Sequence, residues 1–340
     1  MRPEFELYDR REFFGVVSKT AAILGLSTGA AKTARAADSG TANPFAYDLR
    51  RLEKTDPALV AYQEVGRWRS PRKEPKRIAV GPDDRIYLCA GNYVTVMSRE
   101  GQTVLEIALP DTACCVTAAK DGAIYAATRD HIEVFDAAGQ RRAIWDSPGR
   151  KSWLTSLATG GNDVFAADSG NRIILRYDRS GRLMGRLGEK NAERNIPGFI
   201  VPSPYLQVEI HRDGLLRVNN PGRHEVEAYT LDGDFEGAWG KASAAIDGFC
   251  GCCNPIAIAA LPDGRIVTGE KGLPRVKVYT AAGEFESVVA GVEGFPENAK
   301  ACSDLNDCTR GGLDVAVDSQ GRIYIVDFVT AEVRVMKRKS

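Results

Sequence analysis

The residues best suited to chemistry in this chain are its cysteines, and their positions are not random. Of the eight cysteines, seven lie in segments that connect strand-rich repeats. These seven are Cys114, Cys115, Cys250, Cys252, Cys253, Cys302 and Cys308. Clustered sulfur atoms can form disulfides, bind a thiophilic metal ion, or remain as reactive thiols. We therefore expect the function of the protein to lie near these connections.

All three interpretations of the cysteines stay open at this stage. Disulfides would suit an oxidising compartment, for example one that joins Cys302 to Cys308. A thiolate centre for copper(I), zinc or an iron–sulfur cluster would use Cys250, Cys252, Cys253, Cys302 and Cys308, with Cys114 and Cys115 as weaker candidates. The run Cys250-x-Cys252-Cys253 lacks the C-x-x-C spacing of common zinc and iron–sulfur sites, which counts against a metal.

Other ligand sets are weaker. The three histidines, His131, His211 and His224, lie at predicted turns or strand ends, so a histidine-based zinc site is not expected. Lys271 and Arg275 flank a turn beside Glu270, where we expect a surface ion pair.

The elements that must position these cysteines are β-strands. Six times along the chain, a turn of Asp-Gly type stands between alternating apolar segments, and a second turn ending in Gly follows. These turns lie at residues 82–84, 120–122, 161–163, 212–214, 262–264 and 319–321. Residues 256–290 show the full order of strand, turn, strand, loop, strand, turn and strand. This pattern predicts six four-stranded antiparallel units in an all-β protein.

The segment from Phe165 through Asp168 and Ser169 to Ile173 resembles the strand–turn–strand signature of the NHL-repeat family. Similar segments occur around Asp327 and around Glu270. The resemblance covers roughly residues 60–338 and implies a six-bladed β-propeller. Cys89 falls near the end of a predicted strand, and we expect it to be a core residue.

Propellers also suggest an enzyme alternative. Six-bladed lactonases and similar hydrolases hold calcium in the central channel, which implies carboxylate and amide ligands at the ends of second strands. The candidates here are Asp168, Asn219 or Asn220, Glu270 and Asp327. Such residues more often cap their own strand by hydrogen bonds to nearby backbone, and we expect that role for most of them.

The last repeat contains three strands before the chain ends, whereas Tyr62–Trp68 alternates like a strand and belongs to no repeat. Pairing this segment with Glu332–Lys337 would close the ring and remove two exposed strand edges. We predict that the propeller spans residues 59–340, closed by this N-terminal strand, after a polar lead-in over residues 37–58.

The first 36 residues resemble a twin-arginine export signal. Arg10-Arg11 precede two phenylalanines, a short apolar segment follows, and Ala34-Arg35-Ala36 resembles a cleavage site. We therefore expect a periplasmic or extracellular protein, exported in the folded state. Export in the folded state favours a bound cofactor over many disulfides. The spacing of the cysteines, in contrast, counts against a metal.

The rest of the chain limits the possible partners. It retains 39 basic and 41 acidic residues, so it has no basic excess for nucleic acid. It contains no apolar run long enough to span a membrane. We expect a monomeric binding or scaffold module for a periplasmic partner, which could be a redox enzyme. A metal-dependent, lactonase-like hydrolase and a thiolate-metal or redox protein are the alternatives.

Overall fold

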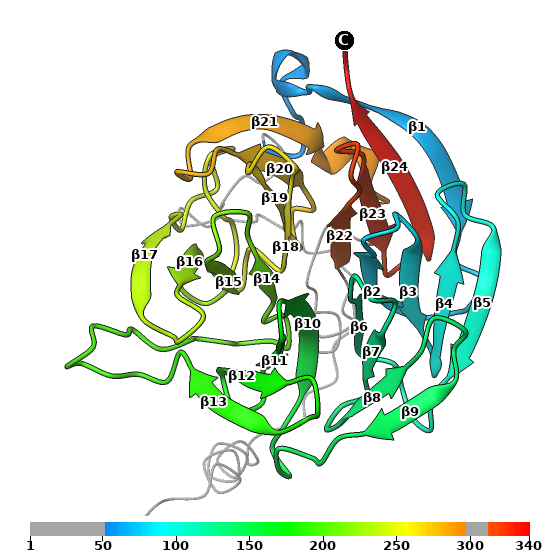
Figure 1. Ribbon diagram of the computed structural model, residues 1–340. Coiled ribbons are helices and arrows are strands. Elements are labelled where there is room, and N and C mark those ends of the chain that lie inside the picture. The colour runs from blue at the N-terminus through cyan, green and yellow to red at the C-terminus, as the bar shows by residue number, and fades with distance from the viewer. Residues whose placement is uncertain (1–51, 297–311) are drawn as a thin grey trace, which may run out of the picture. The chain divides into compact units, whose positions relative to one another are not determined.

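Six four-stranded antiparallel sheets are arranged as the blades of a ring in the computed structural model, which describes residues 52–296 and 312–340 (Figure 1). Five blades follow one another along the chain as β2–β5, β6–β9, β10–β13, β14–β17 and β18–β21. The sixth has the order β1-β24-β23-β22. The predicted class, an all-β six-bladed propeller, is therefore confirmed.

The strands have the following bounds. Blades one and two contain β2 (Pro75–Val80), β3 (Ile86–Ala90), β4 (Tyr93–Met97), β5 (Thr103–Ala108), β6 (Cys115–Ala118), β7 (Ile124–Ala127), β8 (Ile132–Phe135) and β9 (Arg141–Ile144). Blades three and four contain β10 (Leu154–Gly160), β11 (Asp163–Asp168), β12 (Ile173–Asp178), β13 (Leu183–Leu187), β14 (Val208–Ile210), β15 (Leu216–Asn220), β16 (Glu225–Tyr229) and β17 (Phe235–Trp239). Blades five and six contain β18 (Ala257–Ala260), β19 (Ile266–Gly269), β20 (Val276–Tyr279), β21 (Phe285–Ala290), β22 (Leu313–Val317), β23 (Ile323–Asp327), β24 (Glu332–Arg338) and β1 (Tyr62–Arg69).

The ring closes through β1, as the sequence predicted. β1 pairs with β24 in antiparallel register, from Tyr62 opposite Arg338 to Arg69 opposite Glu332. The N-terminal strand thereby supplies the outer strand that the last repeat lacks. Of the described residues, Pro57–Leu59 (η2) and Val292–Gly294 (η3) form short 3-10 helices. None of the helices in this part of the chain has the length and apolar character needed to cross a membrane.

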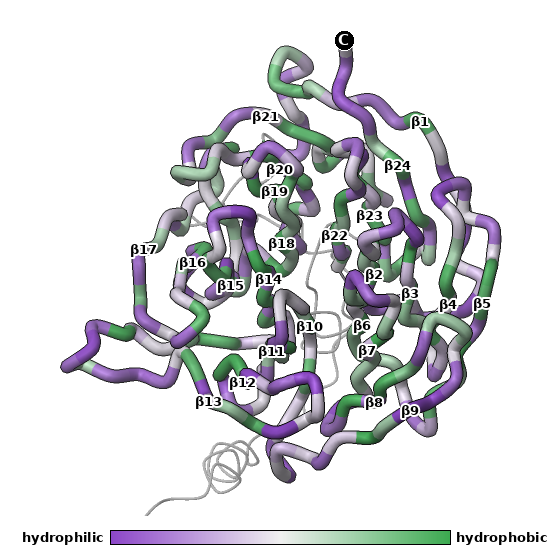
Figure 2. Tube along the Cα trace, viewed as in Figure 1, coloured by the Kyte–Doolittle hydropathy of each residue, from purple (hydrophilic) through white to green (hydrophobic). Residues whose placement is uncertain are grey.

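The hydrophobic core lies between adjacent blades. Tyr87 and Val94 of blade one pack with Val116 and Phe135 of blade two, and similar apolar layers join other neighbouring blades. The arrangement follows from strand geometry. Each strand directs successive side chains to opposite faces of its sheet, and both faces of a blade meet another blade. Figure 2 shows the hydrophobic residues concentrated on the strands, with hydrophilic residues at the turns around the ring.

Side chains of the innermost strands bind backbone N–H groups of the neighbouring blade. Asp314 Oδ2 accepts from Ile78 N at 2.9 Å, which connects blade six to blade one. Gln207 Oε1 accepts from Ile258 N at 2.6 Å, which connects blade four to blade five. An inner strand has a sheet partner on one side only, so these polar residues satisfy donors that face the channel.

Residues 1–51 and 297–311 lie outside the described residues. The predicted export signal over residues 1–36, most of the lead-in, Cys302 and Cys308 fall within them, so those expectations stay predictions.

Candidate functional site

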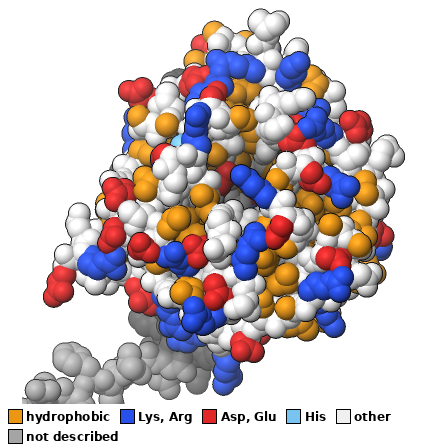
Figure 3. Space-filling model, viewed as in Figure 1, with side chains coloured by type: hydrophobic (Ala, Val, Ile, Leu, Met, Phe, Trp, Pro, Cys, Tyr) orange, Lys and Arg blue, Asp and Glu red, His pale blue; other side chains and the backbone are white. Residues whose placement is uncertain are grey.

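A cavity of about 400 Å³ opens where the innermost strands begin. It is lined by residues just before or at the start of these strands, together with Phe328, which follows β23. The lining residues are Glu74, Pro75, Lys76, Arg77, Cys114, Trp153, Thr155, Pro204, Tyr205 and Phe328. The connections between blades lead into the same ends of these strands, so we call this side of the ring the connection face. Figure 3, which shows one side of the ring, has a hollow at its centre beside basic side chains.

The floor of this cavity is a buried polar bridge across the channel. Arg77 Nη1 lies 3.2 Å from Asp314 Oδ1, and Gln207 Nε2 donates to the same oxygen at 2.6 Å. Arg77 Nε donates to Thr155 O at 2.7 Å, which joins blade one to blade three. The bridge separates the connection-face cavity from a second cavity, also of about 400 Å³, near the ends of the inner strands.

Arg77 has hydrogen-bonding capacity left over. Its side chain is only 7% exposed, and Nε and Nη1 are used in the bridge. The other terminal nitrogen, Nη2, makes no hydrogen bond within residues 52–296 and 312–340. Because an N–H of a guanidinium donates a strong hydrogen bond to a carboxylate, Nη2 of Arg77 can serve as a donor to a ligand that enters from the connection face.

Aromatic rings and cations surround this donor. Trp153, Tyr205 and Phe328 line the cavity. The guanidinium of Arg129 lies 4.9 Å from the centre of the Trp153 ring, and Lys271 Nζ lies 4.4 Å from that of Tyr205. The charged residues that line the cavity itself are Lys76, Arg77 and Glu74. The free donor of Arg77, Lys76 and the aromatic walls favour an anionic ligand with an apolar or aromatic part.

The second cavity contains a carboxyl group that is a much weaker acid than an ordinary glutamate. Glu209 precedes the end of β14, and its Oε1 accepts from Ala260 N at 2.9 Å. Enclosure by the channel wall raises the pKa of Glu209 to about 7, and the negative charge of Asp314 adds to the effect. Glu209 can therefore gain or lose a proton near neutral pH.

The structure places Cys250, Cys252 and Cys253 in one short loop before β18, on the connection face. Cys252 Sγ and Cys253 Sγ lie 3.4 Å apart. Cys253 is buried, Cys252 is exposed and Cys250 is intermediate. The loop lies beside the cavity, because the Asn219 amide donates both to Tyr205 O and to Pro255 O, at 2.7 and 2.8 Å. Among the described residues, no group of three or more His, Cys, Asp or Glu side chains is arranged to hold a metal ion.

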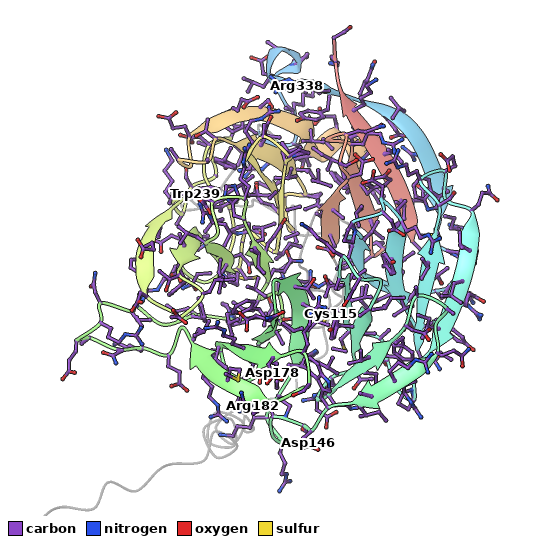
Figure 4. All side chains as sticks on the ribbon, viewed as in Figure 1. Cys115, Asp146, Asp178, Arg182, Trp239 and Arg338 are labelled. Carbon is purple, nitrogen blue, oxygen red and sulfur yellow. The ribbon has the colours of Figure 1, made fainter. Side chains whose placement is uncertain are left out.

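Cys114 and Cys115 lie before and at the start of β6, and Cys114 also lines the connection-face cavity. Both are buried between blades, and Cys115 lies close to the centre of the ring, far from Trp239 at its edge (Figure 4). Cys89 is fully buried in β3, as predicted. Burial raises the pKa of the Cys89, Cys114 and Cys115 thiols, and proximity among these groups raises it further for Cys89 and Cys115. The three thiols are therefore neutral at pH 7, and Cys89 and Cys115 are core residues.

The ion pair expected at the surface beside Glu270 is in fact buried. Glu270 binds Arg275 at 2.8 Å and Lys277 at 2.8 Å, and the three side chains are at most 2% exposed. Burial lowers the pKa of Lys277 to about 8, partly offset by Glu270. The sequence concealed this cluster because the turn Gly272-Leu273-Pro274 resembles an exposed hairpin. The cluster supports the cysteine loop, since Cys250 N donates to Glu270 Oε2 at 3.1 Å.

The oxygens proposed as calcium ligands are used locally, as expected. Asp168 Oδ1 accepts from Trp153 N, Gly170 N and Asn171 N at 2.9–3.1 Å. Asp327 Oδ1 accepts from two backbone N–H groups of the following turn. Asn219 and Asn220 likewise bind nearby backbone.

The histidines also bind their surroundings. The ring of His211 lies 2.9 Å from Gly264 O, and that of His224 lies 2.6 Å from Gly251 O. His131 contacts Thr128 and Asp130 of its own turn. None of the three lines either of the two channel cavities.

Sequence reasoning missed Arg77, Trp153, Tyr205 and Phe328. One signal could have found the first three: each lies just before or within the start of an inner strand, where side chains reach the channel mouth.

Comparison with solved structures supports the fold. Virginiamycin B lyase from Staphylococcus aureus, as a catalytically inactive histidine-to-alanine variant with quinupristin, is 14% identical, with a TM-score of 0.53 over 79% of this chain and 82% of that one. A streptogramin B lyase is 13% identical, with a TM-score of 0.54 over 82% and 97% of the two chains. A structural genomics protein of unknown function from Bacteroides thetaiotaomicron is 15% identical, with a TM-score of 0.56 over 81% and 76%. No family model and no curated protein matches the sequence.

At these identities the likeness shows the fold alone. The NHL assignment therefore stays a prediction from the quoted segments, whereas the six-bladed propeller is confirmed.

Proposed function

We propose that this protein is an exported, monomeric binding module that recognises another periplasmic protein through the connection face of its propeller. The observation that carries the proposal is the cationic, aromatic cavity above the Arg77–Asp314 bridge. Its volume and its mixture of aromatic walls with a few polar groups are typical of ligand-binding sites.

Arg77 and Lys76 favour an acidic segment of the partner. An aspartate, glutamate or chain-terminal carboxylate can accept from Arg77 Nη2, while an adjacent apolar side chain packs against Trp153 or Phe328. Lys76 is exposed at the rim, where it adds long-range attraction for acidic segments. The cysteine loop lies next to this opening and enlarges the surface that a partner can contact.

Two enzyme alternatives have less support. A calcium-dependent hydrolase needs free oxygens directed to one point, whereas Asp168 and Asp327 are bound to local backbone. The lyase neighbour loses activity when one histidine is replaced, whereas the three histidines of this chain lie away from both channel cavities.

The test is affinity enrichment of periplasmic proteins by the mature chain, followed by quantitative mass spectrometry. We expect a protein retained by the wild type to be reduced at least about 10-fold by Trp153→Ala or Lys76→Glu. Its retention should weaken with added salt, because charge attraction is screened.

Lys120→Glu is the matched control. Lys120 is also an exposed lysine but lines the second cavity, at the other end of the channel. Retention unchanged in the cavity variants but lost in Lys120→Glu would place binding at the other end and refute the proposal.

A further inference from the structure

The innermost strands turn backbone oxygens toward the second cavity. The N–H groups of Ile78, Ile258 and Ala260 point into the channel, where a side chain of the preceding blade accepts from each of them. The N–H and C=O of one residue in an antiparallel strand point to the same side, so these three carbonyl oxygens face the channel as well. They accept no hydrogen bond from the described residues, and all three residues line the cavity. The wall therefore has its donors satisfied and offers acceptors.

Glu209 adds a charged acceptor to this wall. Its Oε1 accepts from Ala260 N at 2.9 Å. Its other oxygen, Oε2, has no hydrogen bond or ion pair within residues 52–296 and 312–340. Glu209 lines the second cavity and is only partly buried, so a ligand in the cavity can reach the carboxyl group.

The other charged groups that line this cavity are paired or solvated. Arg77 and Asp314 bind each other at 3.2 Å in the bridge across the channel. Lys120 is exposed at the rim, where water and salt screen its charge. Cys115 also lines the cavity, but burial raises the pKa of its thiol and keeps it neutral. The uncompensated charge inside the cavity is therefore that of the Glu209 carboxylate.

We propose that the second cavity binds a small primary ammonium ion that carries a short alkyl chain. An ammonium group has three N–H donors and no acceptor, which matches a wall with one carboxylate oxygen and several carbonyl oxygens. The alkyl chain can pack against the small apolar side chains of the same cavity, which include Ala118, Ala158 and Val315.

The size and the ligand set of the cavity support an organic cation. The volume of about 400 Å³ lies within the range of small-molecule sites. Among residues 52–296 and 312–340, no three His, Cys, Asp or Glu side chains are grouped to hold a metal ion. A single unpaired carboxylate suits a singly charged ammonium better than a divalent metal ion, which prefers several charged oxygen ligands.

Binding of the ammonium ion should strengthen from pH 6 to pH 8. An alkylammonium group stays protonated over this range, as a lysine does. Glu209, with a pKa of about 7, loses its proton. The ionised fraction of Glu209 rises about 10-fold between the two pH values, so the affinity should rise by about the same factor.

The test is isothermal titration calorimetry of the mature protein with n-pentylammonium chloride, and with 1-pentanol as a neutral ligand of similar size. We expect saturable binding of one equivalent of the ammonium ion at pH 8, and binding of 1-pentanol at least about 10-fold weaker. Glu209→Gln should weaken ammonium binding at least about 10-fold and remove its pH dependence. Urea denaturation of this variant at pH 8 verifies that it is folded.

Glu74→Gln is the matched control, because Glu74 is also a glutamate but lines the connection-face cavity at the other end of the channel. It should bind the ammonium ion as the wild type does. Unchanged binding in Glu209→Gln would overturn the proposal, and so would loss of binding in Glu74→Gln alone. Equal affinity for 1-pentanol would show that the cavity selects apolar ligands without regard to charge, which would also overturn it.

Discussion

Glu209 shows how the channel changes the chemistry of a single residue. Its carboxyl accepts one backbone hydrogen bond from the next blade and otherwise faces the second cavity. Its pKa of about 7 exceeds the ordinary 4.5 because enclosure disfavours the charged form. The folded chain therefore binds this proton more tightly than the unfolded chain. The contribution of Glu209 to the free energy of unfolding is therefore fully present below pH 4.5 and is lost as the pH rises through 7.

We predict that Glu209→Gln is more stable than the wild type at pH 8, by about 1–3 kcal/mol, and that the difference disappears near pH 5. Glutamine keeps an oxygen for Ala260 N but carries no charge. Urea denaturation at both pH values measures the effect. Glu106→Gln is the control: Glu106 is exposed and paired with Arg72, which lowers its pKa, so its removal should not stabilise the protein at pH 8. Equal stability of Glu209→Gln and wild type at pH 8 would contradict a raised pKa for Glu209.

The residues of the candidate site differ in how far sequence predicts them. The cysteines were evident because thiols in connecting segments need an explanation, and their grouping at 250–253 is local. The bridge between Arg77 and Asp314 joins residues 237 positions apart. Nothing in the local sequence around Arg77 distinguishes a channel arginine from a surface one, so only the ring arrangement reveals the cavity floor.

At the scale of elements, a large side chain from the outer part of one blade covers a turn of the next. Trp239 at the end of β17 lies against Gly283, in the turn between β20 and β21, and Trp68 of β1 lies similarly against Gly101. Gly283 has a φ of 87°, and a Cβ there would stand 2.2 Å from Trp239 Cγ. The glycine is therefore required both by its backbone conformation and by the tryptophan.

We predict that Gly283→Ala lowers the free energy of unfolding by about 2–5 kcal/mol, because overpacking adds to the left-handed backbone cost. Gly272→Ala is a matched control, since Gly272 has a φ of 83° but no atom within 4 Å of the added methyl group. It should cost only about 1–2 kcal/mol. Denaturant midpoints at constant slope measure both changes, and equal losses would show that the tryptophan contact contributes nothing.

The turns themselves were predictable from sequence, because Asp-Gly pairs between alternating apolar segments specify hairpins. The contact between Trp239 and Gly283 was not, since it joins two repeats and depends on how neighbouring blades pack. The same reason explains why the ion pair of Glu270 with Arg275 was expected at the surface: the sequence reveals the turn, whereas the covering loop at residues 244–250 comes from the preceding connection.

At the scale of the whole molecule, closure depends on β1. We predict that deletion of residues 59–69 exposes the edge of β24 and lowers the melting temperature by more than about 10 °C, with association through the free edge. The control is a circular permutant in which the same residues follow Ser340 through a short turn. It restores the pairing of Tyr62 with Arg338 and should melt within about 3 °C of the wild type.

Calorimetry and size-exclusion chromatography measure these outcomes. A deletion variant that stays monomeric with an unchanged melting temperature would show that the ring is stable without its N-terminal strand. The strand itself was predictable, because one unassigned alternating segment and one incomplete repeat require each other.

In the proposed function, partners bind at the connection face, over the cavity formed by Lys76, Arg77, Trp153, Tyr205 and Phe328. Site-specific photo-crosslinking in the native host tests it most directly, with p-benzoylphenylalanine at Phe328 and, for comparison, at the exposed Ile144 of the outer strand β9. We expect a discrete protein adduct at Phe328 that disappears with Lys76→Glu, and no such adduct at Ile144. An adduct at Ile144 and none at Phe328 would contradict it.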